Sequence, residues 1–188
     1  MNLRVIDLIK IKLPLRINFF SMKDYIKSLL KIQKCFLFLF LITLLFSCKD
    51  KSIYDGSKPI TDNSWHYSDK KDNYVAIGNN SIAYNLYLNV RITTDYKYSN
   101  LFVLLHIYPP GGGKVSTQRL EFKLANPEGK WLGSGSGTIY TYQIPFARDV
   151  KFDKAGVYNF QLEQNMRDEP LRDIVDIGIR IEKAGTGS

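Results

Sequence analysis

Cysteine is scarce in this chain, and its placement excludes a whole class of folds. The 188 residues include only two cysteines, Cys35 and Cys48, and residues 49–188 contain none. That part of the chain cannot form a disulfide or a thiolate metal site, the usual supports of small secreted domains. We therefore expect residues 49–188 to fold by side-chain packing alone.

Histidines and the common catalytic motifs are also scarce. His66 and His106 are the only histidines, and the sequence contains no zinc-protease motif, acidic calcium loop or Gly-x-Ser-x-Gly nucleophile motif. The glycine-rich stretch 133–137 is not followed by the Lys-Ser/Thr of a phosphate loop. The clustered acidic residues near the C-terminus share one connection, whereas glycoside hydrolysis needs two carboxyls facing across a cleft; they are Asp168, Glu169, Asp173 and Asp176. We predict that the protein is not an enzyme and has no catalytic residue, metal site or cofactor.

The chain also lacks a hydrophobic run long enough to span a membrane. Its uncharged apolar stretch covers residues 35–46, whereas a spanning helix needs about 20 residues. Lysines precede this stretch and Ser47 and Cys48 follow it, as in a secretory signal that ends in a bacterial lipobox. We predict a lipoprotein signal peptide over residues 1–47, with Met22 as an alternative start, cleavage after Ser47 and lipid on Cys48. The alternatives are an uncleaved anchor and a buried hydrophobic helix.

The excess of positive charge is confined to this leader. The formal net charge is +8, but residues 1–47 hold 8 basic and 2 acidic residues, which leaves 18 basic and 16 acidic residues elsewhere. Basic leaders are a property of export signals. Because no Lys/Arg cluster interleaved with aromatic residues remains to contact phosphates, we expect no nucleic-acid partner.

The hydrophobic pattern after Cys48 predicts an all-β fold. Residues 83–93 alternate apolar and polar side chains, which is typical of a half-buried strand. Residues 101–108 are apolar on both faces, which indicates a central strand, and with 115–124 they form a predicted β-hairpin. Further strands are predicted at 73–77, 138–144, 147–152, 156–164 and 174–182.

Seven or eight strands separated by turn signals predict an antiparallel β-sandwich, either immunoglobulin-like or jelly-roll-like. Residues 153–158 (DKAGVY) resemble the turn and tyrosine that brace the corner of immunoglobulin-like sandwiches. We place the sandwich at residues 65–183. A flexible tether at 48–64 is expected before it and a flexible tail at 184–188 after it.

Two tryptophans supply the candidate interaction surface. Trp65 begins the predicted sandwich, and Trp131 lies among glycines in the loop 126–137, where it would be hard to bury fully. Loops carry many binding residues and Trp is enriched at interface hot spots. The alternative is that both side chains support the core, with Trp131 folded back over the sandwich edge.

A series of short segments occurs in a fixed order from Trp65 onward. They are residues 84–91 (YNLYLNVR), 95–102 (DYKYSNLF), 125–133 (ANPEGKWLG), 156–158 (GVY), 164–167 (QNMR) and 174–182 (IVDIGIRIE). In this order and spacing they resemble the gliding motility lipoprotein family GldH of the Bacteroidetes, over about residues 48–183. The resemblance implies a lipid-anchored envelope protein needed for gliding over surfaces. The family has no known catalytic residues, so Cys48 alone carries over.

These observations predict a lipid-anchored protein of the gliding machinery that acts through protein–protein contacts. Its expected partners are the membrane, through the lipid on Cys48, and other envelope or motility proteins, with no small-molecule ligand. We expect it at the outer membrane, with the periplasmic or surface face left open. The alternatives are a carbohydrate-binding sandwich lipoprotein and an accessory of the associated protein secretion system. A tryptophan exposed in a concave groove would favour the sugar binder, and a flat apolar patch a protein partner.

Overall fold

The computed structural model describes residues 25–34, 51–135 and 137–185. The chain divides into two units, Met1–Lys49 and Asp50–Ser188. In the first unit, residues 25–34 are helical and exposed. Among the described residues, no helix combines the length and the apolar character needed to cross a membrane. Cys48 and the predicted cleavage point lie outside the described residues, so the signal peptide and the lipidation stay predictions.

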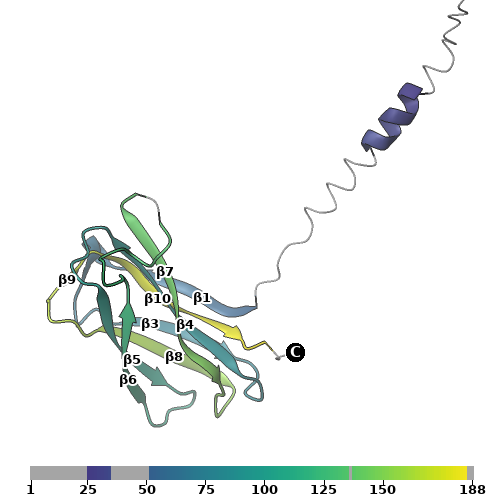
Figure 1. Cartoon of the computed structure of the whole chain (residues 1–188). Coiled ribbons are helices and arrows are strands. Elements are labelled where there is room, and N and C mark those ends of the chain that lie inside the picture. Colours follow the sequence, from purple (N-terminus) through teal and green to yellow (C-terminus); the bar gives the residue numbers. More distant parts are fainter. Residues whose placement is uncertain (1–24, 35–50, 136, 186–188) are drawn as a thin grey trace, which may run out of the picture. The chain divides into compact units, whose positions relative to one another are not determined.

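The second unit is built of antiparallel strands that pack as two sheets (Figure 1). One sheet has the order β1-β10-β4-β7, the other has the order β3-β8-β5-β6, and β2 pairs with β9. This confirms the predicted all-β antiparallel sandwich. The elements are β1 Ser52–Pro59, the 3-10 helix η1 Thr61–Asn63, β2 Ser64–Trp65, β3 Lys71–Ile77, β4 Tyr84–Thr93, β5 Asn100–Tyr108, β6 Ser116–Lys123, β7 Ile139–Val150, β8 Gly156–Gln164, β9 Leu171–Arg172 and β10 Ile174–Lys183.

The eight long strands form four nested pairs. The first pairs with the last (β1 with β10), then β3 with β8, β4 with β7 and β5 with β6. Successive pairs alternate between the two sheets. This is the arrangement of one long hairpin wrapped around a core, which is the topology of a jelly roll. Of the two predicted alternatives, the structure has the jelly-roll order.

Alternation along the strands builds the core between the sheets. In β4, every second residue from Tyr84 to Ile92 is at most 2% exposed, and β10 adds Ile177, Ile179 and Ile181 at 0%. The strand β5 lies between β8 and β6, as its apolar character on both faces predicted. The predicted hairpin is confirmed, because β5 and β6 pair from Asn100↔Lys123 to Ile107↔Ser116.

The turn before β8 has the predicted bracing tyrosine. The hydroxyl of Tyr158 donates to the carbonyl of Lys154 at 3.0 Å, and its ring packs against Phe152 and Phe160. Gly156 has a φ of 139°, a backbone conformation that favours glycine. The tyrosine corner typical of immunoglobulin-like sandwiches therefore occurs here in a jelly-roll order.

Residues 52–64 do not form the flexible tether predicted for 48–64. Ser52–Pro59 pairs with β10 along its length, and Ile60 is only 4% exposed. The prediction was wrong because an edge strand that has one partner and is only partly buried needs few apolar residues. The sandwich begins at Ser52 and not at Trp65.

The two ends of the sandwich carry different parts of the chain (Figure 1). The chain enters at Ser52 and leaves near Lys183, and these residues are neighbours because Ser52 pairs with Glu182; we call this the proximal end. The opposite, distal end carries the connections 94–99, 124–138 and 165–173, because β4, β6 and β8 finish there. Any surface formed by these connections is therefore remote from both points where the chain enters and leaves the sandwich.

Candidate functional site

Trp65 belongs to the core. Its side chain is 0% exposed, and its indole Nε1 donates to the carbonyl of Asp69 at 2.8 Å. The pairing of Trp65 with Leu171 in the small β2–β9 ladder holds it there. A side chain without accessible surface cannot touch a partner, so Trp65 is removed from the candidate surface that the sequence suggested.

Trp131 is partly buried in a group of aromatic rings at the distal end. Its ring centre lies 6.4 Å from that of Tyr96 and 6.0 Å from that of Tyr140, and Tyr98 packs edge-on against Tyr96 at 5.9 Å. A backbone bridge between Ala125 and Trp131 closes the loop. We call Tyr96, Tyr98, Trp131 and Tyr140 the aromatic cluster. Trp131 thus packs over the end of the sandwich while part of its side chain stays accessible.

Within the glycine-rich stretch 133–137, residues 133–135 lie close against β7. Ser134 and Thr141 exchange two backbone hydrogen bonds of 2.9 and 2.8 Å. A Cβ at Gly133 would lie 2.6 Å from the ring of Tyr142, and one at Gly135 would collide with the carbonyl of Ile139. Gly133 and Gly135 therefore permit a close backbone approach, which explains these two glycines without a phosphate ligand.

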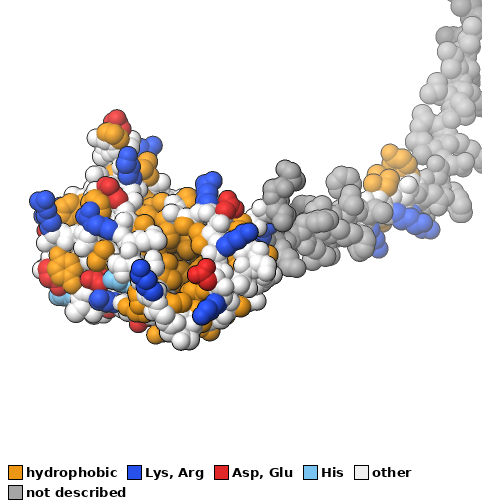
Figure 2. Space-filling model, turned by 90° about the horizontal axis from the view of Figure 1, so that it is seen from below, with side chains coloured by type: hydrophobic (Ala, Val, Ile, Leu, Met, Phe, Trp, Pro, Cys, Tyr) orange, Lys and Arg blue, Asp and Glu red, His pale blue; other side chains and the backbone are white. Residues whose placement is uncertain are grey.

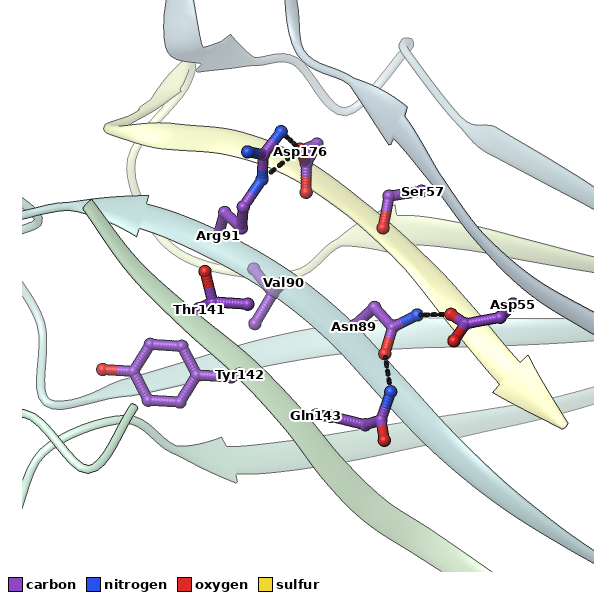
Figure 3. Close-up of a pocket in the computed structure, with 9 residues that line it drawn as sticks. All are labelled: Asp55, Ser57, Asn89, Val90, Arg91, Thr141, Tyr142, Gln143 and Asp176. Carbon is purple, nitrogen blue, oxygen red and sulfur yellow. Dashed lines mark hydrogen bonds and ion pairs between the residues drawn. The ribbon is translucent and has the colours of Figure 1, made fainter. Parts of the chain in front are cut away.

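A polar depression of about 330 Å³ lies on the outer face of the β1-β10-β4-β7 sheet (Figure 3). Its lining residues are Asp55, Ser57, Asn89, Val90, Arg91, Thr141, Tyr142, Gln143 and Asp176. The amide of Gln143 donates to Asn89 Oδ1 at 3.1 Å, so side chains of β4 and β7 meet across the sheet. Groups of these types can bond the hydroxyls of a sugar or the polar groups of a peptide.

The charged groups of this depression already have partners within the domain. Asp55 accepts from Asn89 and from Arg180, each at 2.7 Å. Asp176 is 5% exposed and accepts from Arg91 Nε at 2.6 Å, a bond that raises the pKa of Arg91. A ligand would have to replace these bonds, whereas as cross-strand pairs they stabilise the sheet.

The acidic residues of the C-terminal connection do not face one another across a cleft. Glu169 lies 2.9 Å from His66 Nδ1 and accepts from the amide of Tyr67, and these bonds outweigh burial and lower its pKa. Among the described residues, no group of three or more His, Cys, Asp or Glu side chains could hold a metal ion. The partners of the others are Lys97 for Asp168, Thr93 for Asp173 and Arg91 for Asp176.

His106 is held in a polar cluster on the outer face of the β3-β8-β5-β6 sheet. Its Nε2 lies 3.0 Å from Glu163 and its Nδ1 lies 2.9 Å from Thr117. Lys70 Nζ lies 2.7 Å from the same carboxylate. Burial raises the pKa of Glu163, but the bonds from Lys70 and His106 outweigh it, so the pKa is lowered. The histidine is packed and bonded within the fold.

A groove of about 460 Å³ lies at the distal end, beside the aromatic cluster, and its residues come from β5, β6 and the connections before β5 and after β8. No single segment of the sequence indicates this site, because only the nested topology brings the segments together. We call this site the arginine groove; its lining residues are Tyr98, Asn100, Phe102, Arg119, Asn165, Met166 and Arg167. The surface of the domain also has hydrophobic patches among basic and acidic side chains, as Figure 2 shows for one face.

Comparisons with known proteins give a consistent result. The model of the GldH lipoprotein family matches residues 52–181. The chain is 37% identical over 160 residues to a gliding motility lipoprotein GldH homolog of Christiangramia forsetii, which covers 79% of this chain and 94% of the relative. It is 32% identical over 162 residues to gliding motility lipoprotein GldH of Flavobacterium johnsoniae, covering 82% and 99% of the two chains. No solved structure matches. This protein belongs to the GldH lipoprotein family.

Proposed function

We propose that this protein is a lipid-anchored component of the gliding machinery in the cell envelope, and that it acts through contacts with other envelope or motility proteins. The family match carries this proposal, because it runs from the first residue of β1 into β10 and thus covers all but the last two residues of the sandwich. The relative from Flavobacterium johnsoniae is named a gliding motility lipoprotein. The anchor is the lipid on Cys48, after removal of residues 1–47.

The two ends of the sandwich suit two different roles, attachment to the membrane at the proximal end and contact with partners at the distal end. Cys48 precedes Ser52 by four residues, which span at most about 14 Å when extended. Lipid on Cys48 therefore keeps the proximal end near the membrane surface. The distal end, with the aromatic cluster and the arginine groove, is the part of the sandwich free to meet partners.

The anchor is tested with two cysteine variants. Cys48→Ala is expected to lose palmitate labelling, to retain residues 1–47 and to abolish spreading on agar, because stable attachment needs two lipid chains. Cys35→Ala is the matched control, since this cysteine leaves with the leader, and it should be labelled and spread normally. Palmitate labelling and normal spreading of Cys48→Ala would reject the proposed anchor.

A role in the associated protein secretion system makes a different prediction in the same cells. If the protein acts in gliding alone, a deletion strain stops spreading while its secreted proteins reach the medium at normal levels. If the protein is a secretion accessory, both measurements fall together.

Carbohydrate binding is a second candidate, favoured by the polar depression of Figure 3. Its specific test is Asn89→Leu, which removes the amide that joins Asp55 to Gln143. Loss of retention on insoluble cell-wall polysaccharide in this variant would support a sugar site. Absence of any retention by the unaltered protein would reject it.

A further inference from the structure

We propose that the arginine groove binds an acidic peptide segment of a partner protein. The proposal rests on the proposed function only in taking the partner to be a protein, and it names the chemistry of the contact.

The groove holds two arginines without a carboxylate partner among the described residues. The guanidinium of Arg119 lies over the ring of Phe102 at 3.9 Å, and its Nε donates to Asn165 Oδ1 at 2.6 Å. Arg167 is exposed and makes no bond within the described chain. The nearby carboxylate of Glu121 accepts from Asn100 at 2.7 Å. Both guanidinium groups therefore keep donors for an outside anion.

A comparison with the polar depression shows why the arginine groove is the better site for an anion. The depression is lined by two aspartates and one arginine, and its carboxylates are bonded to arginines within the domain. The lining of the arginine groove has two arginines and no acid. Arginine presents a planar fork of donors that matches a carboxylate. An anion in the groove gains new charge-assisted bonds, whereas one in the depression would compete with existing bonds.

The wall of the groove is fixed before any ligand arrives. The amide of Asn165 donates to the carbonyl of Phe102 at 2.9 Å, and the amide of Phe102 points to Met166 Sδ at 3.2 Å. Gln164 is 0% exposed, accepts from the amide of Met166 at 2.8 Å and donates to the carbonyl of Asp168 at 3.1 Å. A preformed wall lowers the entropy lost on binding.

The groups around the arginines favour a peptide over an acidic polysaccharide. Sugars stack on open aromatic faces, but Arg119 covers one face of Phe102 and Lys97 lies over Tyr98 at 5.3 Å. The two asparagines keep one group each for a peptide backbone: Nδ2 of Asn165 as donor and Oδ1 of Asn100 as acceptor. Met166 adds an adaptable apolar contact. These groups suit acidic side chains alternating with apolar ones.

The test uses the mature lipoprotein in detergent micelles and a fluorescein-labelled peptide of alternating glutamate and leucine, followed by anisotropy. We expect saturable binding that weakens with added salt. Arg119→Gln and Arg167→Gln should each weaken it about tenfold, which corresponds to about 1.4 kcal/mol. The matched control is Arg148→Gln, which removes an exposed arginine from β7 in the other sheet and should leave the affinity unchanged.

Several results would overturn the proposal. They are absence of binding, equal affinity for a peptide with lysine in place of glutamate, and unchanged affinity of Arg167→Gln, whose side chain makes no contact that folding requires. Tighter binding of oligogalacturonate that both groove variants lose would assign the groove to an acidic polysaccharide instead. Because this assay requires neither motility nor a membrane, its failure would leave the proposed function standing, and failure of the Cys48 test would leave the groove standing.

Discussion

At the scale of single residues, Trp131 combines a packing role with partial exposure. Trp131→Ala removes the ring contacts with Tyr96 and Tyr140. For a partly buried tryptophan, we expect a loss of about 2–3 kcal/mol in the free energy of unfolding, below the range for a fully buried one. Trp131→Phe keeps an aromatic ring and should lose less than half as much. Urea denaturation of both variants measures this.

Stability and spreading together distinguish a packing role of Trp131 from a role in binding a partner. A large loss of stability with a lower protein level shows that Trp131 mainly holds the distal loop. Unchanged stability together with lost spreading would contradict that and make Trp131 a contact residue. If both stability and spreading were normal, the contact surface would lie elsewhere, with the arginine groove as the next site.

Glu163 gives the fold a defined acid sensitivity. Its pKa in the folded protein lies below the ordinary value of 4.5, because bonds from Lys70 and His106 outweigh burial. The stabilisation is therefore complete above about pH 4.5 and is lost as the pH falls through the folded pKa. Glu163→Gln should be less stable than the unaltered protein at pH 7, and the difference should shrink below pH 4. A difference that stays constant across this range in thermal unfolding would show that the carboxylate contributes nothing by its charge.

Single residues also show which contacts the local sequence does not indicate. Trp65 stands after a polar segment, and nothing local indicates that Leu171 will pair with it or that Asp69 will accept from its indole. Burial of this kind depends on contacts between distant segments. Tyr158 was predictable because its partner, Lys154, is four residues away.

At the scale of elements, β4, β5, β8 and β10 could be predicted because they are flanked by strands on both sides and carry regular apolar patterns. Of the four edge strands, β3 and β6 were also predicted, but β1 was missed and β7 was divided into two. The sequence of β1 (SIYDGSKP) has few apolar residues. The strand β7 was predicted as two strands around Pro145, which an edge strand tolerates because one side of its backbone has no partner.

Removal of β1 tests its contribution to the sandwich. A fragment of residues 60–188 loses the packing of Ile53 and Tyr54 and the bond of 3.1 Å from the Tyr54 hydroxyl to Asn73. Asn73 is 0% exposed, so its carbonyl loses a donor. Compared with residues 50–188, we expect a free energy of unfolding lower by about 2–4 kcal/mol.

The matched control is Tyr54→Phe in the longer fragment, which removes the hydroxyl alone and should cost about 1 kcal/mol. Equal thermal midpoints for the two fragments would mean that β1 is a dispensable addition to the sheet.

At the scale of the whole molecule, alternation could predict a sandwich but not its strand order. Both immunoglobulin-like and jelly-roll sandwiches use short alternating strands and turns, so only the observed pairing decides. The arginine groove has the same origin, because Phe102, Arg119 and Asn165 meet through the pairing of β5 with β6 and β8. None of its segments has a sequence pattern that by itself indicates a binding site.

The absence of cysteine from residues 49–188 gives a prediction for the whole domain. Residues 50–188 should show β-type circular dichroism and one cooperative unfolding transition, since both sheets share one core. Reducing agent should leave the midpoint unchanged. A shift on reduction, or two separate transitions, would contradict a single core held by packing.

The nested order also decides how the domain bears mechanical force. If lipid holds the proximal end, as proposed, a load on the distal end pulls along the axis of β1. It therefore strains the ladder from Ser52↔Glu182 to Pro59↔Asp176 in shear, all bonds at once. Pulling from Lys51 and Lys183, which leave the same end on neighbouring antiparallel strands, would unzip that ladder one bond at a time. In single-molecule pulling, we expect handles at Lys51 and Asn126 to need a higher rupture force than handles at Lys51 and Lys183. Equal forces would show that the β1–β10 ladder does not carry the load that a moving partner would transmit to the membrane.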